Sequence, residues 1–554
     1  MRRGVSVVNK KVCSFPILFA LLALLIGTCA VVFPASAQAA PTSTGSITVS
    51  GTVASSYDAY QIFSANVVDG DSDAKIATDL AWASDAVRDA ALPVLHSAGM
   101  PNSQTTAQEA AEWLNTDSHL TSALSAQLAR SLQSSGARPA ALNAGTTAEL
   151  PCGYWLIVAD DAAIAQGEAG TAPIMALVGG SAVTVKPKAA TPKVQKHVLE
   201  DSTAAWQKAA DATVADDLYW RLSATVPAGL TAYDTYTVQF VDTMSAGLDP
   251  SKVAASMRVY VAAGADGGFD AVSADKDGRA GTKPAKGWTD ITAQCATKVA
   301  SDGKTFTVRT GDLIAALGGA DAFTAGARVV AVYNAPLNSA CNHGIAKGNP
   351  NEVYLRYPRS PFADQSGDAG FTRTPSDDAC AYTWDLALTK RGSDGDKPLA
   401  GAVLSIADGT WDAEGKATVT TGEDGRVTVS GVDSGKLEVR ELKAPKGYTA
   451  FEDMRSVTVK AEGLDVDQVA AAKPKLTITA ESPLRADSAD GSTGSLEASL
   501  INTPTGTPPS ITIGGFMPST GDMAMYAAAA AAVAGAALIV VALLVKRGGG
   551  SHKE

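Results

Sequence analysis

Three polar residues stand in segments that otherwise have the apolar alternation of β-strands: Lys390, Glu441 and Asn502. An ammonium group buried among apolar side chains loses its solvation, which lowers its pKa and frees the amine as a nucleophile. A buried carboxylic acid that stays protonated can polarise an asparagine carboxamide and pass a proton to departing ammonia. These residue types can therefore form an intramolecular Lys–Asn isopeptide bond once, without turnover. The alternative is a buried Lys–Glu ion pair beside an ordinary asparagine, which is costly to desolvate.

The segment around Glu441 favours the bond. Glu441 is followed by Ala444-Pro445 and Gly447-Tyr448, and this spacing resembles the E-box of Cna protein B-type domains. The segment Leu399-Ala-Gly-Ala402 after Lys390 also follows that family's pattern. The resemblance implies a fold whose first and last strands lie side by side. It thereby brings Lys390 to Asn502, with Glu441 as the catalytic acid.

A second set of the same kind lies upstream. Lys196 falls in a strand-like segment, and the stretch from Phe240 to Leu248 resembles the central domain of backbone pilins, in which an aspartate replaces the glutamate. The resemblance assigns the proton shuttle to Asp242. The acceptor is expected at the start of the domain's last strand, where Asn351 is preferred over Asn349 because it adjoins the strand directly. The competing interpretation is that Asp242 caps a turn and both asparagines shape a loop.

The C-terminal 38 residues carry three consecutive features. Met517-Pro-Ser-Thr-Gly521 comes first, then an uncharged apolar run from about Tyr526 to Val545, then Lys546-Arg547. The run is long enough to cross a hydrocarbon core of roughly 30 Å as a helix, and the basic pair keeps its end cytoplasmic. This order resembles the cell-wall sorting signal of Gram-positive surface proteins, with Met517 where leucine is usual. It implies that a sortase cuts between Thr520 and Gly521 and transfers the Thr520 carbonyl to an amine.

A lysine-rich linker offers that amine. Residues 186–193 hold two prolines and three lysines, which predicts an extended, exposed segment. The stretch Val183-Thr-Val-Lys-Pro-Lys188 resembles the pilin motif of sortase-assembled pilins and puts the acceptor on Lys188. Lys186 occupies the place of a usual tyrosine, so Lys186 and Lys193 remain alternatives. The linker is also compatible with a simple solvated hinge.

The N-terminus has the pattern of a secretory signal peptide. Basic residues precede the apolar segment Phe15–Phe33, and small-residue cleavage sites follow, so the mature chain should begin near Gln38 or Ala40. An extracellular chain can hold disulfides. Cys152, Cys295, Cys341 and Cys380 remain after cleavage, and we expect a Cys295–Cys341 disulfide because both lie in one predicted domain.

Composition excludes several function classes. The formal net charge is −12, and no basic stripe interrupts the acidic balance, which argues against a nucleic-acid partner. The five histidines show no ligand spacing, and HExxH, paired CxxC, a phosphate-binding glycine loop and GxSxG are all absent. The sequence therefore predicts neither an enzyme, nor a metal site, nor a cofactor.

The predicted fold is mainly β, with tandem Ig-like (Cna-B type) β-sandwich domains. The first domain is expected to carry a helical insertion, indicated by the capping box Thr106…Glu109 and by leucines at every fourth position from Leu120 to Leu132. The expected segments are a signal peptide (1–39), an N-terminal domain (40–188), a central isopeptide-forming sandwich (189–375), a Cna-B type sandwich (376–503), a spacer (504–516) and the sorting signal with a transmembrane helix (517–554).

Along its whole length the chain resembles a backbone pilin of Gram-positive sortase-assembled pili. The resemblance implies a secreted, cell-wall-anchored shaft subunit whose Thr520 is joined to Lys188 of the next copy. Its implied partners are a pilus-specific sortase, further copies of itself, accessory pilins and peptidoglycan, with a host surface as a further candidate. The alternative is a monomeric wall-anchored adhesin or minor pilin, which needs no linker lysine.

Overall fold

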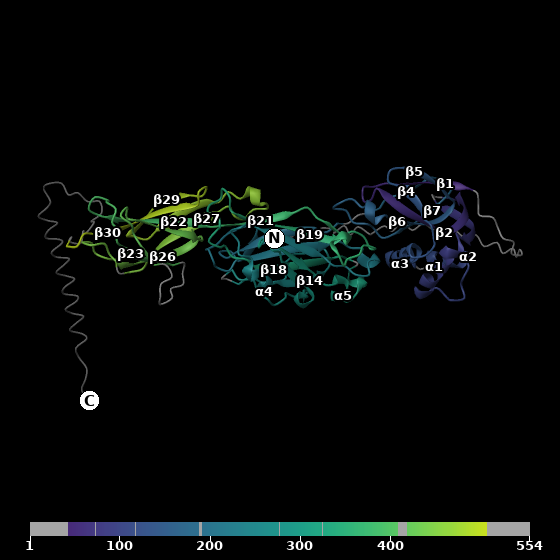
Figure 1. Cartoon of the computed structure of the whole chain (residues 1–554), viewed down its shortest axis with the longest axis horizontal. Coiled ribbons are helices and arrows are strands. Elements are labelled where there is room, and N and C mark those ends of the chain that lie inside the picture. The colour runs from purple at the N-terminus through teal and green to yellow at the C-terminus, as the bar shows by residue number, and fades with distance from the viewer. Residues whose placement is uncertain are drawn as a thin grey trace, which may run out of the picture.

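The computed structural model describes residues 43–506, apart from residues 72–73, 117, 188–190, 276–277, 324, 408–417 and 452. Three bodies lie in a row along the long axis of the molecule, and each is built on two β-sheets (Figure 1). The mainly β architecture with tandem sandwiches is therefore confirmed. The expected signal peptide and transmembrane helix lie outside the described residues. Within the described ranges, no helix has both the length and the apolar character needed to cross a bilayer.

The N-terminal domain consists of eight strands and three α-helices. Its elements are β1 (Thr44–Val49), β2 (Ser56–Asp69), β3 (Lys75–Trp82), α1 (Asp85–Ser97), α2 (Ala107–Asn115), α3 (Ser122–Gln133), β4 (Ala140–Asn143), β5 (Thr147–Pro151), β6 (Gly153–Ala159), a 3₁₀ turn (Asp161–Ala163), β7 (Ile174–Val178) and β8 (Val183–Val185). The larger sheet has the order β3-β2-β6-β7, with β4 also paired to β2, and the smaller sheet has the order β5-β1-β8.

Successive side chains of β6 point to opposite faces of the larger sheet, so this strand contributes to two separate hydrophobic cores. Leu156 and Val158 face the three helices, whereas Trp155 and Ile157 face the smaller sheet. The predicted helical insertion is confirmed between β3 and β4, and α2 begins at the capping box formed by Thr106 and Glu109.

The central domain is the largest of the three. Its strands are β9 (Lys193–Glu200), β10 (Ala205–Gln207), β11 (Ala209–Asp211), β12 (Tyr219–Val226), β13 (Gln239–Met244), β14 (Arg258–Ala263), β15 (Thr289–Asp290), β16 (Ala296–Val299), β17 (Thr305–Arg309), β18 (Ala327–Asn334), β19 (Asn349–Pro358), β20 (Phe371–Arg373) and β21 (Asp377–Tyr382). Two short helices, α4 (Val253–Ser256) and α5 (Leu313–Ala316), lie in its connections, with 3₁₀ turns at Leu230–Ala232, Pro250–Lys252, Thr292–Gln294, Ala320–Phe323 and Asp368–Gly370.

Two sheets enclose one apolar core in this domain. The first has the order β10-β9-β12-β18-β14-β15, and the second has the order β11-β21-β19-β13-β17-β16, with β20 paired to β19. Strand β21 therefore belongs to the central domain, because it pairs with both β19 and β11. The predicted boundary after residue 375 is thus displaced to Thr383.

The third domain is a smaller sandwich. Its elements are β22 (Trp384–Gly392), β23 (Val403–Ala407), β24 (Thr418–Thr420), β25 (Arg426–Val432), β26 (Gly435–Lys443), β27 (Arg455–Glu462), a 3₁₀ turn (Val469–Ala471), β28 (Lys475–Ala480), β29 (Leu484–Asp490) and β30 (Ser495–Asn502). One sheet has the order β25-β22-β30-β29 and the other β24-β23-β26-β27-β28. The first and last strands, β22 and β30, lie side by side, as the family resemblance implied, and they run parallel.

Direct contacts join the central and third domains. The Trp384 indole Nε1 donates to Asp211 Oδ2 at 2.6 Å, and the Ser434 amide donates to the same oxygen at 3.0 Å. On the other side of Trp384, His343 Nδ1 lies 2.6 Å from Asp385 Oδ1. Because only Thr383 separates β21 from β22, the two domains are connected by almost continuous strand.

Candidate functional site

In the third domain, strand alternation directs a lysine and an asparagine into the core. Lys390 lies on the face of β22 that also carries Leu386 and Leu388, and it is fully buried. Asn502 ends β30 and is 2% exposed. Glu441 comes from β26 in the opposite sheet and is 5% exposed, so the three side chains meet between the two sheets.

Their polar atoms form a closed set of contacts. The Lys390 Nζ donates a hydrogen bond to Asn502 Oδ1 and lies 3.2 Å from Glu441 Oε1. The Asn502 Nδ2 donates to both Glu441 carboxyl oxygens, at 2.9 and 3.0 Å. One carboxyl group therefore touches both the amine and the amide nitrogen.

The surroundings shift the Lys390 amine toward its neutral form. Burial lowers the pKa of Lys390 to about 8, and the nearby Glu441 opposes that shift. The Phe451 ring lies 5.7 Å from Nζ, and the Phe451 amide donates to Glu441 Oε2 at 3.2 Å. The site thus holds a nucleophile, a carboxamide and a bridging acid–base group out of water.

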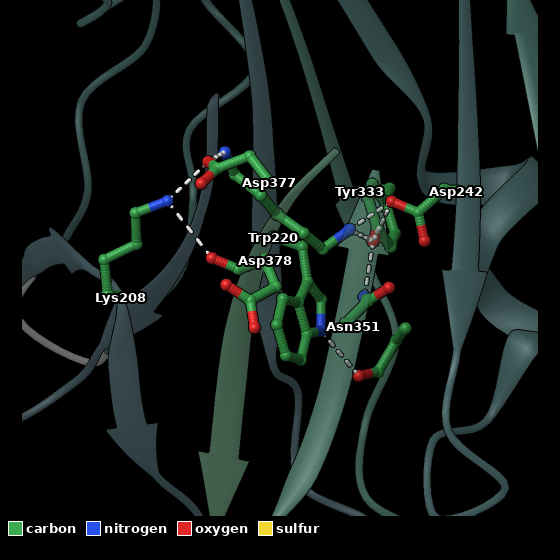
Figure 2. A network of polar contacts seen from close by, with 9 residues as sticks. Lys208, Trp220, Asp242, Tyr333, Asn351, Asp377 and Asp378 are labelled. Carbon is green, nitrogen blue, oxygen red and sulfur yellow. Dashed lines mark hydrogen bonds and ion pairs between the residues drawn. The ribbon is translucent and has the colours of Figure 1, made fainter. Parts of the chain in front are cut away.

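The central domain assembles a similar group from four strands. Lys196 on β9 and Tyr333 on β18 come from the first sheet, whereas Asp242 on β13 and Asn351 on β19 come from the second. All four side chains are fully buried. Figure 2 shows Tyr333, Asp242 and Asn351 converging beside the Trp220 ring.

The Tyr333 hydroxyl is the centre of this network. Lys196 Nζ donates to Asp242 Oδ2 and to the Tyr333 hydroxyl, the latter at 3.0 Å. Tyr333 donates to Asp242 Oδ2 at 3.1 Å, and Asn351 Nδ2 donates to the Tyr333 oxygen at 2.8 Å. The Lys196 Nζ also lies 5.5 Å from the centres of the Trp220 and Tyr333 rings.

Burial shifts both ionisable partners toward their neutral forms. It lowers the pKa of Lys196 to about 8, against the opposing effect of Asp242. It raises the pKa of Asp242, and here Lys196 and Tyr333 oppose the shift. Nucleophilic attack by a lysine amine requires the neutral amine, and both shifts bring the pair closer to that state.

The two asparagines that the sequence left open have different environments. The Asn349 amide is satisfied by the backbone, since Nδ2 donates to the carbonyls of Asn342 and Ala381 and Oδ1 accepts from the Asn342 amide. The Asn351 Oδ1 is buried without a hydrogen-bond partner. Asn351 therefore has a free carbonyl, and its amide nitrogen shares the Tyr333 hydroxyl with Lys196. Its strand β19 is not the last of the domain, because β21 follows.

Sequence reasoning missed Tyr333. The residue occupies an inward position in the apolar strand β18, where a tyrosine is ordinary core material. Only the arrangement of β18, β9, β13 and β19 in space shows that Tyr333 lies beside the other site residues. No signal in the sequence separates it from an ordinary core tyrosine.

The remaining predicted site residues have separate outcomes. Lys186 and Lys193 are exposed, while Lys188, Thr520 and Gly521 lie outside the described residues. Within the described part of the chain, no group of three or more histidine, cysteine, aspartate or glutamate side chains is arranged to hold a metal ion.

The predicted Cys295–Cys341 disulfide is wrong, because Cys152, Cys295, Cys341 and Cys380 are all free thiols. The Cys295 thiol donates to the Ile291 carbonyl at 3.3 Å, and Cys341 Sγ lies 3.6 Å from His343 Nε2. Membership of one domain did not bring the two cysteines together.

Comparison with known proteins adds the following. Residues 385–473 match the SpaA prealbumin-like fold domain family. The trypsin-resistant surface T6 protein of Streptococcus pyogenes serotype M6 is 32% identical over 136 residues, which cover 23% of this chain and 24% of that protein. The match therefore spans about a quarter of that relative.

Two solved structures are similar over most of the chain. The T6 backbone pilin of S. pyogenes serotype M6 is 17% identical with a TM-score of 0.44, covering 84% of this chain and 98% of that one. The major pilin SpaD of Corynebacterium diphtheriae is 15% identical with a TM-score of 0.42, covering 83% and 98%. Residues 385–473 thus match the SpaA prealbumin-like fold domain family, and the chain that carries them is similar to the T6 and SpaD pilins.

Proposed function

We propose that this chain is the shaft subunit of a covalently polymerised surface pilus, stabilised by two intramolecular isopeptide bonds. The bonds join Lys390 to Asn502 in the third domain and Lys196 to Asn351 in the central domain. Glu441 and Asp242 are the respective catalytic acids. The observation that carries the proposal is the repetition, in two successive domains, of a fully buried lysine in contact with a carboxyl group. An asparagine contacts the lysine directly in the third domain and shares the Tyr333 hydroxyl with it in the central domain.

An ion pair alone is a weaker account of these sites. A fully buried lysine and carboxylate lose solvation that their mutual attraction restores only with good geometry. Conversion of the amine to an amide removes the charge altogether. In the chain-entropy model, a cross-link that closes the 112-residue separation between Lys390 and Asn502 stabilises the domain by about 5 kcal/mol.

Polymerisation would use the sorting signal and the linker. A sortase cleaves after Thr520 and joins its carbonyl to Lys188 of the next copy, with Lys186 and Lys193 as the other linker amines. In such a fibre, tension enters each subunit at the linker and leaves through the C-terminus. The central and third domains then carry the load, while the N-terminal domain lies outside its path. The two proposed bonds lie in the two loaded domains.

Intact mass tests the bonds. Residues 40–510 should be lighter than their calculated mass by two ammonias, and Glu441→Ala and Asp242→Ala should each restore one. Glu438→Ala, which removes the carboxylate that pairs with Lys436 on the same strand, is the matched control for Glu441→Ala and should keep both losses. An unchanged calculated mass in the parent chain would reduce both sites to ordinary core contacts.

A polymerisation assay tests the shaft role. Incubation of the chain through its sorting motif with the cognate sortase should give a ladder of covalent multimers, and Lys188→Ala should abolish it while Lys186→Ala and Lys193→Ala retain it. A chain that is attached to peptidoglycan but never to itself would favour the monomeric adhesin or minor pilin instead.

A further inference from the structure

The two sites use their carboxyl groups differently. In the third domain, Glu441 contacts both nitrogens between which a proton must pass, the Lys390 Nζ and the Asn502 Nδ2. In the central domain, Asp242 contacts the Lys196 Nζ through Oδ2, whereas its Oδ1 has no hydrogen-bond partner. The Asn351 Nδ2 donates to the Tyr333 hydroxyl instead.

Side-chain length explains the difference. Aspartate is one methylene shorter than glutamate, which withdraws the carboxyl group by about 1.5 Å. The Tyr333 hydroxyl fills the space between, 3.0 Å from Lys196 Nζ and 2.8 Å from Asn351 Nδ2. It therefore bridges the lysine and asparagine nitrogens of the central domain, as Glu441 bridges the equivalent pair in the third domain.

We propose that Tyr333 is a catalytic residue of the central domain, whose hydroxyl carries a proton from the lysine nitrogen to the departing asparagine nitrogen. The inference rests on the proposed Lys196–Asn351 bond and divides between Asp242 and Tyr333 the work that Glu441 does alone. Asp242 takes the first proton, and Tyr333 transfers the second.

The reaction balances as follows. The Lys196 ammonium gives one proton to the Asp242 carboxylate, leaving a neutral amine and a carboxylic acid. The amine lone pair attacks Asn351 Cγ, and the carbonyl π electrons move onto Oδ1. The Nζ, now positively charged, gives a proton to the Tyr333 oxygen while the Tyr333 hydroxyl proton passes to Nδ2. The Oδ1 electrons return, the Cγ–Nδ2 bond breaks, and ammonia leaves.

Tyr333 is suited to pass a proton without keeping the charge. Burial, with Asp242 adding to the effect, holds the pKa of its hydroxyl well above the ordinary value. A free phenolate is therefore strongly disfavoured, and proton receipt and proton release must be concerted. Proton transfer by a positioned side chain typically accelerates a reaction by about 10²–10⁴-fold.

Tyr333 also packs in the core, with its ring edge-on to Phe306 at 4.8 Å between centroids. Tyr333→Phe retains the ring and removes only the hydroxyl, so it separates the two roles. Tyr357→Phe is the matched control, because Tyr357 is another fully buried tyrosine of this domain, and its hydroxyl donates to the Gly167 carbonyl away from the site.

The test measures ammonia loss over time by intact mass in residues 40–510, refolded from an unfolded and unbonded state. Tyr333→Phe should slow the central-domain loss by about 100-fold or more, while the third-domain loss in the same molecule keeps its normal rate. Tyr357→Phe should lose both ammonias at the parent rate. Asp242→Glu combined with Tyr333→Phe should recover the reaction, because the longer carboxyl group can bridge both nitrogens as Glu441 does.

Two outcomes would overturn the assignment. One is a central-domain bond that forms at the parent rate in Tyr333→Phe. The other is a slow central-domain ammonia loss in Tyr333→Phe that the added Asp242→Glu does not accelerate. That result would give the hydroxyl a structural role and not a catalytic one. Failure of the underlying bond is distinguishable, since the parent chain itself would then lose only one ammonia, and Asp242→Ala would show the same one-ammonia deficit from its own calculated mass.

Discussion

The two proposed bonds should limit mechanical extension to different degrees. In the third domain, Asn502 is the last residue of the last strand. A load that enters at β22 passes through the Lys390–Asn502 bond and leaves at once, so residues 391–501 are shielded. In the central domain, the load passes from Lys196 to Asn351 and must still traverse residues 352–382, which include β20 and β21, before it reaches the third domain.

The magnitude follows from chain length. A fully extended chain spans at most about 3.3–3.6 Å per residue. The unprotected segment after Asn351, about 30 residues long, can therefore lengthen by no more than roughly 100 Å. Without its bond, the central domain of about 190 residues could extend by roughly 650 Å, and the third domain of about 120 residues by roughly 400 Å.

Single-molecule force spectroscopy would measure these lengths, with handles at the linker and after the third domain. The parent chain should show at most one short step, from the peeling of β21 and β20, and no step from the third domain. Asp242→Ala should add the long central step, and Glu441→Ala should add the third-domain step. A parent chain that extends by either full domain length would refute the load path and the bond that defines it.

Three further predictions concern the third-domain site and the cysteines. Glu441→Asp should abolish the third-domain ammonia loss, because the neighbouring aromatic residue is Phe451, which has no hydroxyl to bridge the gap; a retained loss on intact mass would contradict this. In Asn502→Ala, Lys390 stays a free amine whose folded pKa of about 8 lies below its ordinary 10.5, so the folded state binds fewer protons and stability should rise by about 3 kcal/mol between pH 8 and 10.5. Urea titrations against the bonded parent chain should show that rise, and a flat profile would contradict it. Alkylation in denaturant without reductant should label four thiols in residues 40–510, and fewer labels would indicate a disulfide.

Much of the third-domain site could be predicted because its signals are local in sequence. Strand alternation turns Lys390 inward with Leu386 and Leu388, and the turn chemistry after Glu441 fixes the strand that carries it. Burying a polar side chain at an inward position costs free energy unless the side chain forms hydrogen bonds or an ion pair. This cost, together with the spacing that resembles the E-box of Cna protein B-type domains, was enough to name Lys390, Glu441 and Asn502 from the sequence.

The central domain was harder because its contacts are not local. Four strands from two sheets supply Lys196, Tyr333, Asp242 and Asn351, and no spacing rule relates them. The domain boundary failed for a related reason. The expected boundary followed residue 375, whereas β21 and β22 meet at Thr383, where there is no glycine or proline and the strand is nearly continuous.

The disulfide was mispredicted because a shared domain says nothing about the distance between two Cα atoms. Cys295 lies just before β16, the edge strand of the second sheet, while Cys341 lies in the long connection between β18 and β19. An isopeptide bond does not require two neighbouring cysteines, and unlike a disulfide it resists reduction.

The two proposed bonds would resist two different kinds of strand separation under load. The third-domain bond joins parallel neighbours within one sheet, where a pull at opposite ends would otherwise shear the two strands apart. The central-domain bond connects β9 of one sheet to β19 of the other, so it prevents the sandwich from separating into its layers. Residues 352–382 remain under load beyond that bond, but β21 is held by pairing with both β11 and β19 and by the Lys208–Asp377 ion pair. If the proposed bonds form, this segment is the part of each subunit that yields first under load. It should refold when the tension falls, because its strand pairings can form again, and the proposed bonds would keep the rest of both domains intact.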